Sequence, residues 1–172
     1  SSIIFLKDLD NLKVNEKNIL ITCNTGKIIK KKIFTSLNLA INIHGGSFDF
    51  PGRDAHHWAC YYDSSTFGST THFISEKVDQ GEIIDYEIKK IKKNTSPKEY
   101  REAAYSCSKE LLLRIIKAIF SKNITYKRAH WSKKSIRRSA LIKYCDFRDL
   151  QKEEIKKREY AFQGFEKFFN YK

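Results

Sequence analysis

The sequence predicts an α/β fold with a mostly parallel sheet, and three observations support this class. A strand, a helix and a second strand follow one another between residues 18 and 44, the order that a parallel pair with a crossover requires. A long amphipathic helix with a capping signal begins near residue 96. The chain has 172 residues, 41% of them hydrophobic, so it can form one domain with its own core.

The first predicted elements form the strand–helix–strand unit. The apolar segment NILITCNT, residues 18–25, ends in a Thr-Gly turn and is typical of a strand. The segment KIIKKKIFTSL, residues 27–37, has apolar residues at helical spacing and predicts a short helix. LAINIH, residues 39–44, predicts the second strand, and the breaker-rich GGSFDFPGRD, residues 45–54, predicts a loop.

The middle of the chain predicts one helix and two extended segments. AHHWACYYD, residues 55–63, is a predicted helix. GSTTHFISEKV, residues 68–78, begins as a Thr-rich strand. DQGEIIDYEIKKI then turns at Gly81 into another extended segment.

The long helix has the clearest local signals. Ser96 is a suitable N-cap, Pro97 suits the first turn, and Glu99 completes a capping box. Apolar residues then recur at three-and-four spacing along the helix. They are Tyr100, Ala104, Cys107, Leu111 and Ile115.

The remainder of the chain is basic and aromatic. It predicts a last helix over DLQKEEIKKREYAFQGF with Asp149 as its cap. We therefore expect a core over residues 1–120 and a helical, basic C-terminal extension over 121–172 that packs on it. The aromatic residues of the tail are spaced like one face of a helix and predict packing. They are Phe162, Phe165, Phe168, Phe169 and Tyr171.

Composition restricts the class of protein. The net charge of +13 favours phosphate-bearing ligands, nucleic acid or an acidic surface, or it reflects lysine as the ordinary surface residue of this chain. No apolar run approaches the roughly 20 residues that span a bilayer, and the first residues lack a signal-peptide pattern, so we expect no membrane partner. Cys23, Cys60, Cys107 and Cys145 lack motif spacing and predict reduced, mostly buried thiols in a cytoplasmic protein.

Three polar residues are the candidate site. Asn42 and His44 alternate on a predicted strand and so share a face at its C-terminal end, where open α/β sheets bind ligands. Asp79 precedes the glycine turn at the end of another strand, so the three can converge. The alternatives are a core histidine that a buried amide satisfies and an aspartate that caps a turn.

These residue types suit acyl transfer to or from nitrogen. An amide and an imidazolium can donate hydrogen bonds to a developing oxyanion, and a carboxylate can hold the imidazole and relay the proton of an attacking amine. No cysteine or serine nucleophile is needed. No metal is expected, because no histidine–carboxylate cluster has ligand spacing.

Three blocks of the sequence resemble the formyltetrahydrofolate-dependent formyltransferases. This family includes the glycinamide ribonucleotide, methionyl-tRNA and amino-sugar formyltransferases, with formyltetrahydrofolate hydrolase as a relative. INIHGG resembles the family's Asn-x-His block, and FPGRDAHHW resembles its Pro-Gly-Arg loop before a helix. GSTTHFISEKVDQGEII is similar to its strand, loop and catalytic Asp-x-Gly. Order and spacing agree across residues 18–120.

The resemblance implies a Rossmann-like formyltransferase fold with Asn42, His44 and Asp79 as the catalytic set. It also implies a role for TGKIIKK, whose backbone would line the pterin pocket, with formyltetrahydrofolate as the formyl donor. The residues expected at the folate are Gly26, Lys27, Ile28, Ile29 and Val78.

Two further residues are candidates for contact with the substrate. His72 matches a position that histidine often holds in the family, although it could instead pack within the sheet. Arg53 could bind a phosphate or carboxylate, or it could tie down its own loop. His56, His57 and Trp58 could border the amine site, but we prefer helix-surface and core roles for them.

Our leading hypothesis is formyl transfer to a small primary amine, with an amino sugar on a nucleotide as the acceptor. Hydrolysis of formyltetrahydrofolate and a truncated, non-catalytic member that binds a ligand or partner are the alternatives. We do not expect a methionyl-tRNA acceptor, because those enzymes carry an added RNA-binding domain. The basic tail could touch RNA, but it shows no base-stacking motif, so nucleic acid is not the expected partner.

The sequence departs from the family pattern in two places. Gly45 and Gly46 stand where the family usually has proline and serine. The family also has several strand–helix units before the point that corresponds to Ser1, so we expect a fold truncated at its N-terminus. An uncovered strand edge invites pairing, and we expect a second copy or another chain along the N-terminal strand.

Overall fold

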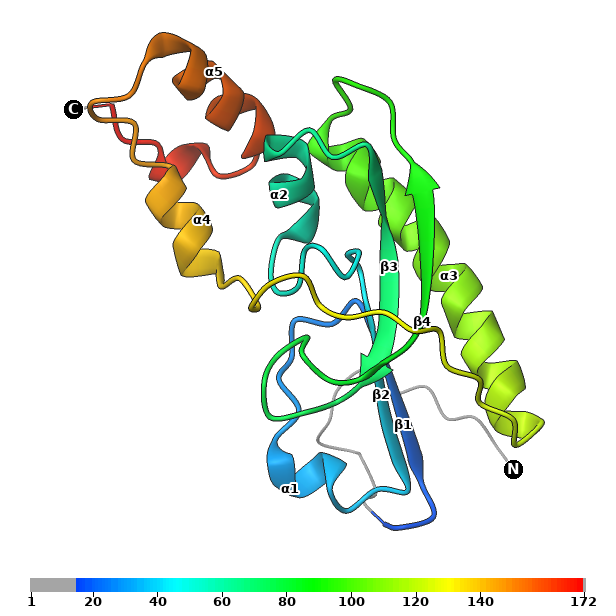
Figure 1. The fold of residues 1–172 in the computed structure, drawn as a ribbon. Coiled ribbons are helices and arrows are strands. Elements are labelled where there is room, and N and C mark those ends of the chain that lie inside the picture. Colours follow the sequence, from blue (N-terminus) through cyan, green and yellow to red (C-terminus); the bar gives the residue numbers. More distant parts are fainter. Residues whose placement is uncertain (1–14, 172) are drawn as a thin grey trace.

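The computed structural model describes residues 15–171, which form one mixed four-stranded sheet with helices around it (Figure 1). The sheet order is β1-β2-β3-β4, in which β1 and β2 are parallel and the other two pairs are antiparallel. The predicted α/β class is confirmed, but the sheet is only partly parallel. The strands are β1 (Ile19–Cys23), β2 (Leu39–His44), β3 (Thr66–Phe73) and β4 (Ile83–Lys90).

The helices lie on both sides of this sheet. The long helix α3 runs along one face, while α4 and α5 lie beyond α2 (Figure 1). None of the helices among residues 15–171 is both long and apolar enough to cross a membrane. The helices are α1 (Lys31–Phe34), α2 (Ala55–Tyr61), α3 (Pro97–Phe120), α4 (Arg138–Tyr144) and α5 (Lys152–Ala161), and a 3₁₀ turn follows at Glu166–Phe168.

The helix α3 confirms the capping signal read from the sequence. The Ser96 hydroxyl accepts from the Glu99 N–H, and the Glu99 carboxylate accepts from the Ser96 N–H, which satisfies donors at the helix start. The five apolar residues expected on one face are all buried. Leu111 and Ile115 pack against Ile41 of β2, so α3 closes one face of the sheet.

The helix α1 is shorter than predicted. Helical geometry covers only Lys31–Phe34, whereas the apolar spacing predicted a helix over residues 27–37. Lys30 is extended, with φ −65° and ψ 145°. Ile29 is buried in a core cluster with Leu20 of β1. Because this burial draws the backbone toward the strands, residues before Lys31 form a loop.

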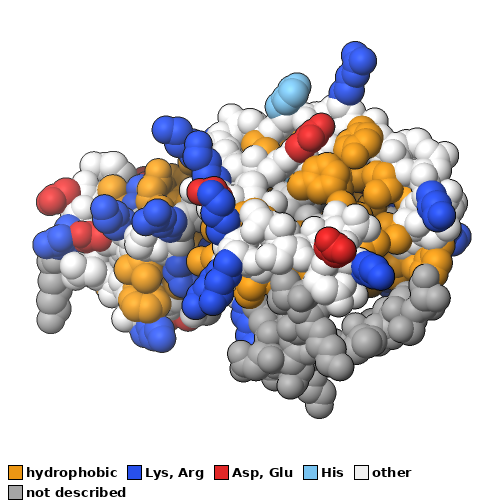
Figure 2. Space-filling model, turned by 90° about the horizontal axis from the view of Figure 1, so that it is seen from below, with side chains coloured by type: hydrophobic (Ala, Val, Ile, Leu, Met, Phe, Trp, Pro, Cys, Tyr) orange, Lys and Arg blue, Asp and Glu red, His pale blue; other side chains and the backbone are white. Residues whose placement is uncertain are grey.

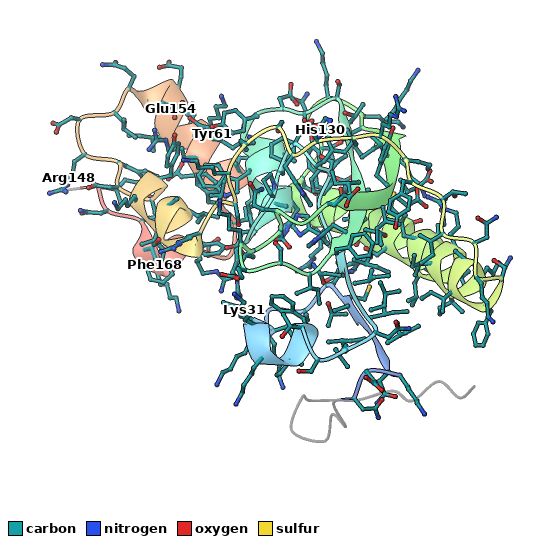
Figure 3. The ribbon with its side chains drawn as sticks, turned by 60° about the horizontal axis from the view of Figure 1, so that its bottom comes forward. Lys31, Tyr61, His130, Arg148, Glu154 and Phe168 are labelled. Carbon is teal, nitrogen blue, oxygen red and sulfur yellow. The ribbon has the colours of Figure 1, made fainter. Side chains whose placement is uncertain are left out.

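The C-terminal extension packs on α2. The buried Leu141 and Phe162 join Trp58 and Tyr61 in one aromatic core cluster. Tyr61 also donates a 2.6 Å hydrogen bond to Glu154 of α5 (Figure 3). On the face seen in Figure 2, Lys and Arg side chains are most crowded over the part that carries α4 and α5.

Two details of the predicted tail are wrong. Asp149 does not cap α5, which begins after Gln151 and has no side-chain cap, and Asp149 has φ +61°. The tail aromatics do not lie on one helix face, because α5 ends at Ala161. They still pack, since Phe162 and Phe165 are buried.

The remaining expectations concern thiols and the strand edge. All four cysteines are free, and Cys60, Cys107 and Cys145 are buried, whereas Cys23 is exposed. Among the described residues β1 pairs with β2 alone. The expected partner along that edge remains a prediction.

Candidate active site

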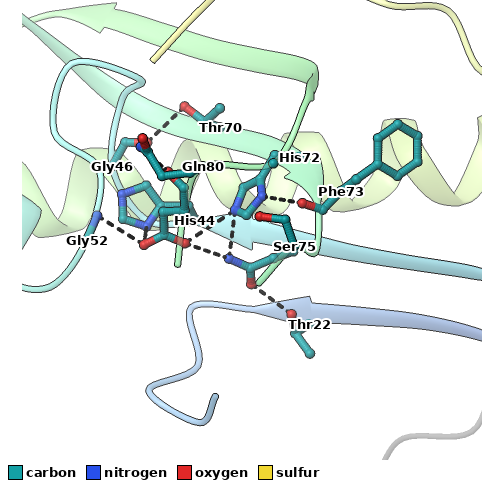
Figure 4. A network of polar contacts seen from close by, with 12 residues as sticks. Thr22, His44, Gly46, Gly52, Thr70, His72, Phe73, Ser75 and Gln80 are labelled. Carbon is teal, nitrogen blue, oxygen red and sulfur yellow. Dashed lines mark hydrogen bonds and ion pairs between the residues drawn. The ribbon is translucent and has the colours of Figure 1, made fainter. Parts of the chain in front are cut away.

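A cluster of polar side chains lies on the sheet face opposite α3 (Figure 4). Asn42 and His44 come from β2, and His72 stands opposite Asn42 on β3. Asp79 comes from the loop before β4. His44, His72 and Asp79 are each at most 9% exposed. The structure therefore brings together the amide, imidazole and carboxylate of the candidate site, while their catalytic role remains a prediction.

The Asp79 carboxylate lies at the centre of this cluster. Its Oδ2 is 3.4 Å from His44 Nδ1 and accepts a 3.0 Å hydrogen bond from the Gly52 N–H. Its Oδ1 is 3.3 Å from His72 Nε2 and accepts from Asn42 Nδ2 at 3.3 Å. Each carboxylate oxygen thus faces two polar groups, and the side chain has one defined orientation.

The environment keeps Asp79 ionised. Burial raises the pKa of Asp79, but His44, His72 and the N–H of Gly52 together lower it by more than burial raises it. The resulting pKa is about 2, below the ordinary 3.8. At neutral pH the cluster therefore contains a buried negative charge.

His44 is held on both of its ring nitrogens. Its Nε2 lies 2.9 Å from the Phe50 carbonyl, opposite the Nδ1 that faces Asp79. A carbonyl oxygen only accepts, so Nε2 carries a proton in this arrangement. The ring also lies close to the backbone, because a Cβ on Gly46 would be 2.5 Å from Nε2. A glycine is therefore needed at position 46.

The neighbouring glycine has a similar explanation. A Cβ on Gly45 would lie 2.4 Å from Oδ1 of Asn24. Asn24 has φ +49°, and its Nδ2 donates to Ser108 of α3 at 3.1 Å. Gly45 and Gly46 depart from the family pattern. Gly45 leaves room for the side chain of Asn24, and Gly46 leaves room for the imidazole of His44.

His72 and Thr22 fix the amide of Asn42. His72 Nδ1 lies 2.8 Å from the Phe73 carbonyl and therefore carries a proton, while its Nε2 faces Asp79 Oδ1. Asn42 Nδ2 lies 3.1 Å from that Nε2. Thr22 donates to Asn42 Oδ1 at 2.8 Å. The amide nitrogen therefore points into the cluster and the oxygen points toward β1.

The residues expected at the folate lie on two adjoining loops. Ile28 is 74% exposed and Val78 is 43% exposed, whereas Ile29 is buried in the core. Lys31, the first residue of α1 after the first loop, forms an ion pair with Glu76 of the second loop. Ile28 and Val78 thus expose apolar side chains on these two loops, and Ile29 could contribute only its backbone.

Arg53 and the histidines of α2 lie outside the cluster. The exposed Arg53 donates from Nη1 to the Gly26 carbonyl at 3.5 Å, so it reaches a different loop from its own. His57 is buried and its Nδ1 lies 2.7 Å from the Ala161 carbonyl. Trp58 is also buried, which agrees with the core role we preferred for these residues.

Two groups at the cluster, the Gly52 N–H and the Trp131 ring, could not be assigned to it from the sequence. The Pro-Gly pair indicated a turn at Gly52 but not that its N–H would meet Asp79. Trp131 contacts both imidazoles from a segment that shows no periodicity. Among residues 15–171, no group of three or more His, Cys, Asp or Glu side chains is arranged to hold a metal ion.

Comparisons with solved structures give formyltransferases. A 4-N formyltransferase from Francisella tularensis is 18% identical, with a TM-score of 0.69 over 92% of this chain and 66% of its own. An N-formyltransferase from Helicobacter canadensis is 20% identical, with a TM-score of 0.69 over 93% of this chain and 59% of its own. The phosphoribosylglycinamide formyltransferase from Campylobacter jejuni is 27% identical, with a TM-score of 0.53 over 60% of this chain and 55% of its own.

These similarities establish the fold over part of a longer architecture. The chain spans 55% to 66% of the length of those three proteins. A comparison with curated proteins gives no match. The model of the formyl transferase family matches residues 7–116, which is more than half of the sequence. The chain therefore belongs to the formyl transferase family.

Proposed function

We propose that the protein transfers a formyl group from formyltetrahydrofolate to a small primary amine, with an amino sugar linked to a nucleotide as the leading acceptor. The observation that carries the proposal is the buried cluster of Asn42, His44 and Asp79. Family membership supports the reaction class. The Helicobacter canadensis enzyme was solved with folinic acid and dTDP-3-aminofucose, which supports this choice of donor and acceptor.

The cluster holds the groups that this reaction requires. When an amine attacks a formyl carbon, negative charge develops on the formyl oxygen and the amine must lose a proton. The bond between the formyl carbon and the folate nitrogen then breaks, and that nitrogen takes up a proton, so that tetrahydrofolate leaves. Asn42 Nδ2 and the Nε2–H of His44 are the candidate donors to the formyl oxygen. Both now donate within the protein, to the cluster and to Phe50. Each would exchange one protein acceptor for the formyl oxygen.

Asp79 is the proposed proton acceptor. Its pKa of about 2 keeps it ionised, so it can orient His44, and we propose that it also takes up the proton of the amine. His72 is 2% exposed, and both its ring nitrogens have partners in the protein. We therefore favour for His72 a role in holding Asn42 and Asp79 over direct contact with the substrate.

The two loops beside the cluster fit a folate. Bound there, formyltetrahydrofolate would supply the activated formyl group. Ile28 and Val78 expose apolar surface that an aromatic ring system could cover. The Lys31–Glu76 ion pair connects these loops, so one ligand could contact both.

Arg53 is the candidate contact for a phosphate on the acceptor. It is exposed, and it follows Gly52, whose N–H binds Asp79. A guanidinium suits a phosphate because it can donate two parallel hydrogen bonds. The net charge of +13 would also favour approach of an anionic acceptor.

The test is the release of tetrahydrofolate with and without an amine. Purified protein is mixed with formyltetrahydrofolate and with a panel of amines that includes nucleotide-linked amino sugars, and both products are quantified. Release that depends on an amine, with a formylated product, supports the proposal. Release at one rate with and without every amine indicates a hydrolase. Failure of the folded protein to bind a folate analogue in calorimetry indicates a non-catalytic member.

A further inference from the structure

The segment between α3 and α4 crosses the candidate site. Residues 127–136, here called the strap, run past β4 and the loops at the end of β2 (Figure 1). Three backbone N–H groups of the strap bond to those elements. They are Lys127 to the Ile84 carbonyl at 2.9 Å, Ser132 to the Phe48 carbonyl at 3.1 Å, and Ile136 to the Pro51 carbonyl at 2.9 Å.

Trp131 is the strap residue that reaches the polar cluster. Its ring centroid lies 5.2 Å from that of His72 with an interplanar angle of 83°, and 6.0 Å from that of His44 at 62°. Its indole N–H donates a 2.7 Å hydrogen bond to the Gly81 carbonyl. One side chain thus covers both imidazoles and also binds the loop that carries Asp79.

We propose that Trp131 is a positioning residue of the catalytic cluster, an inference that rests on the proposed formyl transfer. It would hold the Asp79 loop through Gly81 and shield the two imidazoles from water. The family match ends at residue 116, so the strap adds this group from outside the matched region.

The geometry of the Asp79 loop supports this role. A Cβ on Gly81 would lie 1.8 Å from the Phe73 carbonyl, so the loop is pressed against the end of β3. Trp131 holds the Gly81 carbonyl, and Gln80 Nε2 donates to the Lys133 carbonyl at 3.2 Å. Asp79 itself has φ +47°, a conformation that costs energy unless its surroundings impose it. Two contacts with the strap help to impose it.

The apolar ring would also affect the electrostatics of the cluster. An indole beside the His44–Asp79 pair takes the place of water that would otherwise screen it. Loss of the ring would admit water on that side. We therefore expect the cluster to bind the transferred proton less tightly, which would change the pH dependence of kcat.

The first test separates positioning from binding. Trp131→Leu should lower kcat by about tenfold or more, because small displacements of catalytic groups cost up to about a hundredfold. The KM for the folate should stay within about threefold, because the pterin is proposed to rest mainly on the backbone of residues 26–29, which belong to the other loop, and the pH profile of kcat should shift. Trp131→Phe keeps a ring and should recover part of the rate. Lys134→Ala, an exposed change in the strap, is the matched control.

The second test does not depend on activity. Amide hydrogen exchange is followed by mass spectrometry in residues 76–82 and, as a reference, in α5. Trp131→Leu should speed exchange in the loop about tenfold or more and leave α5 unchanged. If Trp131→Leu does not fold, Trp131→Phe carries this test, because it removes the donor to Gly81.

The outcomes distinguish the two proposals. If the protein shows no formyl transfer, the proposed function is refuted. If Trp131→Leu still speeds loop exchange in that protein, the contact by which Trp131 holds the loop is supported independently of the function. An active protein in which Trp131→Leu has wild-type kcat, pH profile and loop exchange would overturn the positioning role. If the substitution speeds exchange by the same factor in the loop and in α5, the positioning role is overturned as well.

Discussion

The backbone N–H of Gly52 donates a 3.0 Å hydrogen bond to Oδ2 of Asp79, although the two residues belong to different loops. Gly52 has φ +100°, and a Cβ there would lie 2.2 Å from the Ile136 carbonyl. Glycine is thus required both for the backbone conformation and for the close approach of the strap. The loop between β2 and α2 and the strap together determine where the carboxylate lies.

Gly52→Ala should therefore destabilise the protein and displace Asp79. The left-handed conformation alone costs about 1 to 3 kcal/mol, and the overlap with Ile136 adds to it. Gly164→Ala is the matched control, since Gly164 has φ +90° and nothing lies within 4 Å of a Cβ there. Urea unfolding should give a clearly larger loss of unfolding free energy for Gly52→Ala. Equal losses would show that the contact with Ile136 does not constrain the fold.

Asp79→Asn should reduce turnover by about two to four powers of ten, the usual contribution of general acid–base catalysis. The substitution keeps the size of the side chain and removes the charge that faces His44. Affinity for a folate analogue should change little, because the pterin is proposed to rest mainly on backbone groups near Ile28, on the other loop. Steady-state kinetics and calorimetry measure the two quantities. Wild-type turnover in this variant would show that Asp79 is only a turn residue.

Asn42→Ala should cost roughly two to three powers of ten in kcat, as expected for the loss of one donor to a developing oxyanion. Thr22→Val provides the comparison, since it leaves the amide in place and removes the hydroxyl that donates to Asn42 Oδ1 at 2.8 Å and to the Ile41 carbonyl at 3.3 Å. We expect Thr22→Val to have a smaller effect. A larger loss in Thr22→Val than in Asn42→Ala would argue against Asn42 as the donor.

The local part of the fold could be predicted from sequence. The helix α3 is determined by the Ser96–Glu99 capping box and a regular apolar face, both of which lie within one stretch of chain. The direction of β3 depends on the path of the chain around α2, which no local pattern encodes. Likewise, the apolar spacing around Ile29 suits a helix, but burial of that residue among strand residues prevails.

The candidate site could be predicted only in part. The alternation of Asn42 and His44 on β2 placed them on one face, and the position of Asp79 before a glycine turn at a strand end made it the third candidate, which the resemblance to the family supported. The Gly52 N–H, the Phe50 carbonyl and Trp131 meet the cluster through tertiary structure, so their positions could not be read from local sequence.

Binding of a phosphate-bearing acceptor should weaken as salt rises, because exposed cations are screened over about 10 Å at 0.1 M salt. Arg53→Gln should raise the KM for such an acceptor and flatten its salt dependence. Lys109→Gln is the control, since Lys109 is an exposed residue of α3, the helix that covers the other face of the sheet. An acceptor KM that does not change with salt in the wild type would indicate a neutral amine.

Stability should fall as the pH drops below about 6.5, and His56 should contribute to this fall. Burial, the adjacent His57 and the cations of Arg101 and Arg138 lower the pKa of His56 to about 3, against an opposing effect of Asp54. The unfolded chain takes up a proton near pH 6.5, whereas the folded protein does not until about pH 3. Between these values the unfolded state binds more protons, so unfolding becomes easier as the pH falls.

The expected slope is at most about 1.4 kcal/mol per pH unit for one such group. His56→Gln should remove part of this dependence when urea unfolding is measured from pH 7.5 to 4.5. His57, whose pKa burial also lowers, should account for a further part. His130→Gln is the control, because His130 is exposed in the strap. If His56→Gln and the wild type lose stability in parallel over that range, His56 is charged in the folded protein and the expected effect of its burial is wrong.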